Sequence, residues 1–374
     1  MTTYLPDYPK KTGDKVNIHH LLTHTSGIPS YTGLPDFVEK RSRDPYTPAE
    51  LIKVFSDMEL EFEPGSKFRY NNSGYFLLGA IIEKVTGQSY EDVLRKRIFE
   101  PLGMRDSGYD HHRTRLAKRA GAYEATLDGY QNAGYLDMSI PYAAGSLYST
   151  VEDLHKWDQA LYTDKVVSAK SRELMFTPVL ENYAYGWTVR KAPSGAKIIG
   201  HGGGINGFST LIERLVEDRH LIVLLNNTGG TRLGEMAEGI RAILAGQEAK
   251  MPKRPVAPAL YQAYKEKGAA AAIAQYRELK AKQSADYDLG PGELGRLAQH
   301  LRRTKKIKDA IEVHKLNTEE NPKNSFAWYG LAEAYREDGN REQAARAYVK
   351  AMDLHPDPLS TPAVDRLKEL SRKQ

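Results

Sequence analysis

The chain of 374 residues carries 53 lysines and arginines against 48 aspartates and glutamates, a net charge of +5, and is 40% hydrophobic. That length predicts about two to three domains with a sizeable core. The absence of cysteine excludes disulfides, thiolate metal sites and a cysteine nucleophile. The basic excess lies in residues 251–374, which carry +6 against −1 elsewhere, and it is too small to indicate nucleic-acid binding. No apolar run reaches the roughly 18 residues that a membrane span needs.

The first region, to about Gly246, mixes helix and strand signals. Thr47-Pro48-Ala49-Glu50 is a capping box that predicts a helix start. A stronger helix is expected after Asn72, where asparagine is a good N-cap, and Gly87 should end it. The inward face of this helix is predicted to comprise Leu77, Leu78, Ile81, Ile82 and Val85.

Further helices are expected from Ser89, from Thr150 and over residues 233–245. β-Branched and apolar residues predict strands at 197–199, 208–215 and 220–225. Glu217-Asp218 is a turn signal between the last two, so these two strands should form an antiparallel hairpin.

Prolines 252, 255 and 258 mark residues 247–259 as a linker, because they prevent a continuous helix or central strand. The region after it has the tetratricopeptide spacing, strongest in a repeat that begins near Trp328 and more moderate 34 residues earlier. Residues 260–283 predict one more helical pair of weaker register. The pattern of the stronger repeat comprises Trp328, Leu331, Ala332, Tyr335, Gly339, Ala344, Tyr348, Ala351 and Pro356.

Three ordered segments carry a resemblance to a known family. They are Leu21–Ile28 (LLTHTSGI), Tyr70-Asn71-Asn72 and His201-Gly202-Gly203-Gly204. Together they resemble the penicillin-recognising serine hydrolases, a superfamily of class C β-lactamases, DD-peptidases and esterases. The resemblance covers about residues 4–246 and implies an α+β fold, a β-lactamase/transpeptidase-like antiparallel sheet flanked by helices. The expected domains are therefore 1–246 (hydrolase), 247–259 (linker) and 260–374 (helical, tetratricopeptide-like).

The resemblance also implies roles for these residues. Tyr70 takes the part of the catalytic base, which requires a phenolate and therefore a nearby cation that lowers its pKa. Asn72 contacts the substrate amide, and His201 supplies a donor beside the substrate carboxylate or acyl group. Gly202, Gly203 and Gly204 let substrate approach the strand, and the N–H of Gly204 forms half of an oxyanion hole.

The family's Ser-x-x-Lys element is expected several dozen residues before Leu21, but only 20 residues precede it. The one Ser-x-x-Lys in the chain, Ser194–Lys197, lies in a turn before a strand and is a poor nucleophile candidate. Tyr4-Leu5-Pro6-Asp7-Tyr8 resembles the stretch that follows the serine helix, so Met1 is expected to be an internal start. Without the lysine, the pKa of Tyr70 is expected near its model value.

Other functional interpretations of the motifs are weaker. His20 and His24 have the i, i+4 spacing of a zinc helix, but no glutamate follows His20, so no metal or cofactor is expected. Residues 302–306 (RRTKK) fall at the turn of the first repeat, where solvated charge is more ordinary than nucleic-acid binding.

The sequence therefore predicts a serine hydrolase that works through an acyl-enzyme on an amide or ester. D-alanyl peptides, β-lactams and small esters are the candidate substrates, and the chain as given is expected to be inactive. The alternative is a non-catalytic scaffold that binds a small ligand, a peptide or a partner protein through its repeats. Neither a nucleic acid nor a membrane span is expected, and the resemblance implies a periplasmic or extracellular location for full-length members.

Overall fold

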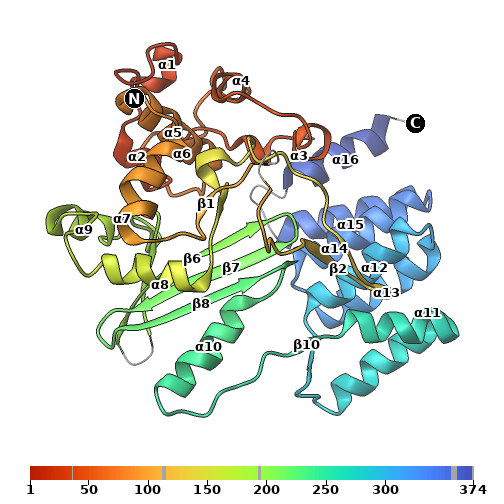
Figure 1. The fold of residues 1–374 in the computed structure, drawn as a ribbon. Coiled ribbons are helices and arrows are strands. Elements are labelled where there is room, and N and C mark those ends of the chain that lie inside the picture. The colour runs from red at the N-terminus through yellow and green to blue at the C-terminus, as the bar shows by residue number, and fades with distance from the viewer. Residues whose placement is uncertain (36, 112–114, 193–194, 355–359, 373–374) are drawn as a thin grey trace. The chain divides into compact units, whose positions relative to one another are not determined.

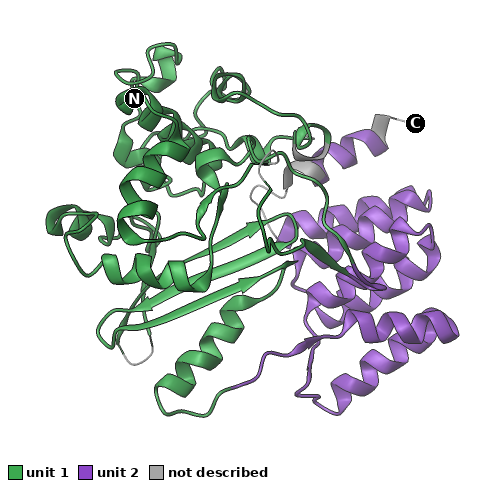
Figure 2. Cartoon of the chain, viewed as in Figure 1, with its two compact units in different colours: residues 1–125, 131–249 green, residues 126–130, 250–374 purple. Residues whose placement is uncertain are grey.

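The computed structural model describes residues 1–35, 37–111, 115–192, 195–354 and 360–372. The chain divides into two compact units (Figure 2): unit 1 comprises residues 1–125 and 131–249, and unit 2 comprises residues 126–130 and 250–374. Unit 1 mixes helices with antiparallel strands and unit 2 is mainly helical (Figure 1), which confirms the α+β fold with a helical tail.

Unit 1 contains mostly short helices before its main sheet and a further helix after it. The helices are α1 (Lys10–Gly13), α2 (Ile18–Leu22), α3 (Phe37–Arg41), α4 (Pro48–Lys53), α5 (Asn72–Thr86), α6 (Tyr90–Leu94), α7 (Glu100–Leu102), α8 (Val151–Ala160), α9 (Ala169–Met175) and α10 (Leu233–Leu244). The small strands are β1 (Gly108–Tyr109), which pairs with β4 (Leu147–Tyr148), and β2 (Tyr123–Thr126), which is followed by β3 (Gly129–Asn132) and pairs with β9 (Thr228–Gly229).

The predicted helix ends of unit 1 are largely confirmed. Thr47 and Glu50 form the capping box of α4, and Gly87 ends α5 in the left-handed conformation with φ +65°. Two details of α5 differ from the prediction. Asn71 is the N-cap, since its side chain accepts from the N–H of Gly74, and Val85 is 62% exposed because the last turn extends beyond the core.

The main sheet has the order β5-β6-β7-β8 and is antiparallel throughout. Its strands are β5 (Thr188–Lys191), β6 (Lys197–Ile205), β7 (Phe208–Leu215) and β8 (His220–Asn226). The predicted hairpin of β7 and β8 is confirmed. The strand expected at 197–199 continues to Ile205, because pairing with β7 extends through His201 and the glycines despite their low strand propensity.

Side chains of β7 alternate between the two faces of this sheet, as strand geometry requires. Leu211 and Leu215 pack in the cluster that includes Ala237 of α10, whereas Ile212 packs in the cluster that includes Leu161 at the end of α8. Helices α10 and α8 therefore cover opposite faces.

Unit 2 is built from paired helices. They are α11 (Ala257–Ala281), α12 (Pro291–Arg303), α13 (Ile307–Glu320), α14 (Ser325–Glu337), α15 (Arg341–Leu354) and α16 (Ser360–Arg372), with short strands β10 (Arg254–Pro255) and β11 (Tyr287–Asp288). Helix α11 starts inside the expected linker, with Pro258 in its first turn, where proline is tolerated. Gly268, with φ +77° and ψ −174°, interrupts α11, as the expected helical pair requires. Pro356 of the repeat pattern lies outside the described residues.

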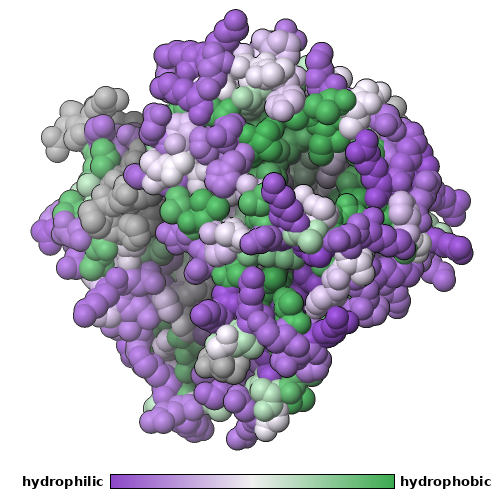
Figure 3. Space-filling view, turned by 90° about the vertical axis from the view of Figure 1, so that its left-hand side faces the viewer, coloured by the Kyte–Doolittle hydropathy of each residue, from purple (hydrophilic) through white to green (hydrophobic). Residues whose placement is uncertain are grey.

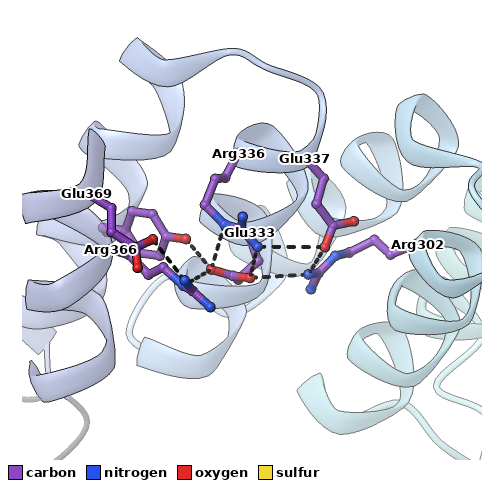
Figure 4. A network of polar contacts seen from close by, with 7 residues as sticks. Arg302, Glu333, Arg336, Glu337, Arg366 and Glu369 are labelled. Carbon is purple, nitrogen blue, oxygen red and sulfur yellow. Dashed lines mark hydrogen bonds and ion pairs between the residues drawn. The ribbon is translucent and has the colours of Figure 1, made fainter. Parts of the chain in front are cut away.

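A buried carboxylate joins the helices of unit 2 (Figure 4). Glu333 on α14 is 8% exposed and contacts Arg336 at 2.9 Å, Arg302 of α12 at 3.4 Å and Arg366 of α16 at 3.6 Å, and it accepts from the hydroxyl of Tyr348 on α15. Arg302, predicted to be solvated charge at a turn, has only 17% of its side chain exposed because Glu333 and Glu337 bind it.

Exposed apolar side chains are spread over both units. On the face drawn in Figure 3, hydrophobic residues lie in patches between hydrophilic ones. Among the described residues of the whole chain, the exposed apolar side chains include Met251 at 84% exposed, Ile243 at 64% and Phe326 at 64%, and exposure of single apolar side chains is ordinary for folded proteins. Among the described residues, no helix combines the length and the apolar character needed to cross a bilayer.

The contacts of Glu333 lead to a prediction about the stability of unit 2. Burial by itself raises the pKa of Glu333, but hydrogen bonds from Arg336 and Tyr348 outweigh it and hold the pKa below its usual value. We expect Glu333→Ala to lower the free energy of unfolding by roughly 1–3 kcal/mol, because it leaves the buried hydroxyl of Tyr348 without its acceptor and removes the carboxylate that three arginines share.

Chemical denaturation of the full chain, followed by circular dichroism, measures this loss. Glu369→Ala is the matched control, since Glu369 pairs with Arg366 at a site where its side chain is 56% exposed, and should change the free energy of unfolding by less than about 1 kcal/mol. Equal effects of the two variants would contradict the assignment.

Candidate active site

Two of the predicted site residues come together in unit 1. Tyr70 lies just before α5, and His201 lies in the middle of β6. Their ring centroids are 6.1 Å apart, and Tyr70 is 49% exposed. The segments that carry the family resemblance therefore place a phenol and an imidazole side by side at an accessible position.

The side chain and the backbone N–H of Asn72 are hydrogen-bonded within the protein. Its side-chain amide donates to Oγ1 of Thr32 at 2.9 Å, and its backbone N–H donates to Oγ of Ser30 at 3.2 Å. The capping role expected of Asn72 belongs to Asn71, which is 3% exposed and whose amide also donates to the carbonyl of Ile28. Asn72 thus begins α5 and is anchored to the segment around Thr32.

Gly202, Gly203 and Gly204 form an exposed stretch of β6. They pair with β7 on one side, whereas the pairing of β5 with β6 ends at Gly200. Among the described residues, this half of β6 therefore lacks a partner strand on its second side. The glycine segment is a free sheet edge beside His201, where an extended substrate can approach the backbone.

A residue that the sequence did not assign to the site connects His201 to the protein interior. Tyr183, 3% exposed, lies in the segment before β5, and its hydroxyl is 2.9 Å from Nε2 of His201. The same hydroxyl is 3.1 Å from Nε2 of His24, which is 1% exposed and stacks with Tyr70 at a centroid distance of 4.2 Å. His24, Tyr70, Tyr183 and His201 form one cluster, called here the imidazole–phenol cluster.

The backbone groups at the two ends of this series of hydrogen bonds determine which atoms donate and which accept. At one end the backbone N–H of Asn71 donates to Nδ1 of His24 at 3.0 Å, so Nε2 of a neutral His24 carries the proton and donates to Tyr183. At the other end Nδ1 of His201 lies 2.6 Å from the carbonyl oxygen of Gly202, which can only accept. Nε2 of a neutral His201 is therefore the acceptor for the Tyr183 hydroxyl.

Burial favours the neutral form of every member of the cluster. It lowers the pKa of His24 to about 3, with a further contribution from nearby His201, and it lowers the pKa of His201 as well. Burial also raises the pKa of Tyr183 well above its ordinary value. Neutral imidazoles have one donor and one acceptor nitrogen each, which is the requirement of the directed chain.

The pKa of Tyr70 is also shifted toward the neutral form, in contrast to the expectation from the sequence. Its pKa was expected near the model value, but partial burial of its ring raises it. No cation is among the causes of that shift. A phenolate base, which the family role requires, is therefore disfavoured in this chain at neutral pH.

Two weaker predictions from the sequence concern a zinc motif and the Ser-x-x-Lys segment. His20 lies in α2, but His24 lies beyond its end with φ +56°, so the two do not share one helix face as a zinc motif requires. Ser194, the serine of the one Ser-x-x-Lys, lies outside the described residues.

The sequence identified Tyr70 and His201 but overlooked the functional placement of His24 and Tyr183. His24 is inside the segment LLTHTSG, and its left-handed backbone turns the ring toward the cluster. Tyr183 follows Glu181 and Asn182, which both have positive φ. No periodicity or spacing in the sequence signals the contact of His24 with Tyr183, which joins positions 159 residues apart.

Comparison with known proteins follows the division of the chain. A family model described as Beta-lactamase matches residues 1–246, and one described as Tetratricopeptide repeat matches residues 325–358. Penicillin-binding protein 4* of Bacillus subtilis (strain 168) is 32% identical over 274 residues, 67% of this chain and 60% of that protein. The chain thus spans about 60% of the length of this relative.

Solved structures are similar over the same region. A D-stereospecific amidohydrolase from Streptomyces sp. is 28% identical with a TM-score of 0.57, covering 66% of this chain and 78% of that one. A penicillin binding protein from Bacillus halodurans is 27% identical with a TM-score of 0.57, covering 64% and 77%.

The protonation of His24 is open to direct measurement. With a folded pKa of about 3 and an unfolded value of about 6.5, the unfolded state binds more protons between these values. His24 therefore contributes stability that is fully present above about pH 6.5 and is lost as the pH falls toward about 3. Side-chain nitrogen resonances of His24, assigned with His24→Gln, should stay unchanged from about pH 8 to about pH 5. A midpoint near the model value would contradict the buried neutral form.

The protonation state of Tyr70 can also be measured. Because the pKa of Tyr70 is raised, we expect the ultraviolet phenolate absorbance of the full chain at neutral pH to be the same as that of Tyr70→Phe. A phenolate component near pH 7 that disappears in Tyr70→Phe would show that an additional cation acts on this tyrosine.

Proposed function

The chain belongs to the β-lactamase family of serine hydrolases, and from this premise we propose that unit 1 binds the acyl part of an amide or ester substrate at the imidazole–phenol cluster. The observation that carries the proposal is the position of Tyr70 and His201, 6.1 Å apart, next to the free glycine edge of β6. In this proposal Tyr70, Asn72, His201 and the glycines 202–204 are the site residues.

The chemistry of acyl transfer supports this assignment. Acyl transfer through serine needs a nucleophile, a base and donors for the oxyanion. The glycine edge offers backbone N–H groups, with that of Gly204 as the proposed donor, and Tyr70 occupies the place of the base. The names of similar proteins, a penicillin-binding protein and a D-stereospecific amidohydrolase, support β-lactams and D-configured amides as candidate substrates. D-alanyl peptides and small esters are further candidates that acyl transfer allows.

The lack of a suitable serine nucleophile limits the chemistry that we propose for this chain. Lys197 of its one Ser-x-x-Lys, residues 194–197, is the first residue of strand β6. Burial also raises the pKa of Tyr70, which opposes its action as a base at neutral pH. We therefore propose that the 374-residue chain binds substrate without forming an acyl-enzyme.

A second candidate function rests on unit 2. The tetratricopeptide match at residues 325–358 gives this unit the capacity for protein interaction. In this alternative the chain is a non-catalytic scaffold that holds a partner protein, and the site in unit 1 is a ligand-binding remnant.

Labelling with a fluorescent penicillin and with a fluorophosphonate tests the first proposal. We expect no covalent label on the purified chain, but saturable, reversible binding of the penicillin, measured by fluorescence anisotropy. Tyr70→Ala should weaken that binding at least about tenfold, the equivalent of 1.4 kcal/mol, through loss of the aromatic wall. Tyr130→Ala, which removes an exposed tyrosine of unit 2, is the control and should leave it unchanged.

Two other results would contradict the first proposal. A covalent adduct would refute the absence of a nucleophile, and mass spectrometry of the adduct would identify the reacting residue. Absence of any reversible binding would favour the scaffold.

A further inference from the structure

The backbone groups of the glycine edge point to alternate sides of β6. In an antiparallel sheet the N–H and the C=O of one residue face the same neighbouring strand, and those of the next residue face the other side. The carbonyl of Gly200 accepts from Oγ1 of Thr188 in β5 at 2.7 Å, and the carbonyl of Ala196 accepts from the backbone N–H that follows β5 at 2.8 Å. Even-numbered residues of β6 therefore face the β5 side, and the backbone groups of Gly202 and Gly204 point to the free edge, beyond the end of that pairing.

The carbonyl of Gly202 is already engaged within the protein. Nδ1 of His201 lies 2.6 Å from its oxygen. The proton is held on Nδ1 because Nε2 accepts from the hydroxyl of Tyr183, which in turn accepts from His24. The imidazole of His201 therefore caps the acceptor that this position of the edge would otherwise offer to a ligand.

The position of Gly204 is open. A Cβ atom at this position would have no heavy atom within 4 Å. Its N–H and C=O both point to the free edge and form a donor–acceptor pair of the kind that joins antiparallel strands. At Gly202, by contrast, the N–H of an added strand would have to share an oxygen that already accepts from His201, and an unsatisfied donor is costly.

We propose that Tyr183 and His24 are positioning residues that hold His201 as a cap on the Gly202 carbonyl, so that an extended ligand pairs with β6 through Gly204. In this scheme His201 determines the alignment of the ligand on the strand. The inference rests on the proposed function, since it concerns how the same site aligns its ligand.

Nuclear magnetic resonance of the full chain can observe the two carbonyls separately. With glycine labelled at its carbonyl carbon and nitrogen, and isoleucine labelled at nitrogen, the carbonyls followed by glycine or isoleucine are detected, among them Gly202 and Gly204. Gly202→Ala and Gly204→Ala assign the signals. Both positions accept a Cβ, since the nearest heavy atom at Gly202, the carbonyl oxygen of Thr210, would be 3.7 Å away and Gly204 has none within 4 Å.

Titration with N-acetyl-D-alanyl-D-alaninamide tests the alignment. We expect the carbonyl signal of Gly204 to shift at least about twice as far as that of Gly202, because only Gly204 gains a hydrogen bond to the probe.

Tyr183→Phe tests the positioning role. Without the hydroxyl, Nε2 of His201 loses its donor, so the proton is no longer confined to Nδ1 and the cap weakens. We expect the carbonyl signal of Gly202 to move before any probe is added, and the two carbonyls to shift by similar amounts on titration. Tyr185→Phe is the matched control, because the hydroxyl of Tyr185 makes a similar contact, 2.8 Å to Nδ1 of His19. It should leave both results unchanged.

A ligand-free measurement on the wild-type chain guards against a variant that fails to fold. Long-range nitrogen–proton couplings report histidine tautomers, and His201 should carry its proton on Nδ1 and His24 on Nε2. A proton on Nε2 of His201 would overturn the proposal whatever the probe does.

The outcomes separate this proposal from the proposed function. Equal shifts at Gly202 and Gly204 in the wild-type chain overturn the alignment and leave the proposed function intact. An unchanged ratio in Tyr183→Phe, with its other glycine signals at their wild-type positions, overturns the positioning role. No binding of the probe, with the expected tautomers present, refutes the proposed function and the alignment with it.

Discussion

The hydroxyl of Tyr183 is the contact on which the candidate site depends. It connects His24, from the loop after α2, to His201, in the middle of β6. A single phenol that accepts from one imidazole and donates to the next requires both to be neutral and in defined tautomers. Burial supplies that condition, since it lowers the pKa of both histidines. The fold therefore sets the protonation state of its site through desolvation rather than through ion pairs.

The sheet that carries His201 is held by charges placed away from the cluster. Arg214 of β7 and Asp158 of α8, both about 1% exposed at the side chain, form a buried ion pair on one face. On the other face Glu213 pairs with Arg190 of β5 and Arg241 of α10. Removing one member of such a pair strands a buried charge, so these contacts fix how the helices pack against the sheet. The position of β6, and with it the glycine edge, follows from that packing.

Local signals in the sequence predicted most of the elements that frame the site. Caps, stops and β-branched runs located α4, α5, β7 and β8, because each depends on neighbouring residues alone. The extension of β6 to Ile205 was missed, since it arises from pairing with β7 across the turn Asn206-Gly207. Tyr70 and His201 were identified only through family resemblance. The roles of His24 and Tyr183 were missed because the contacts between distant segments have no sequence period.

Charged side chains join the helices of unit 2, whereas the candidate site of unit 1 is built from neutral side chains. In unit 2 a carboxylate surrounded by three arginines joins successive helices, and its worth is structural. In the site of unit 1, Tyr70, His24, Tyr183 and His201 pack against one another, and burial is the largest cause of their pKa shifts. An ordered wall of neutral side chains of this kind supplies shape and fixed dipoles. Burial also keeps Tyr70 a phenol at neutral pH, so the packing that orders the site deprives it of a base.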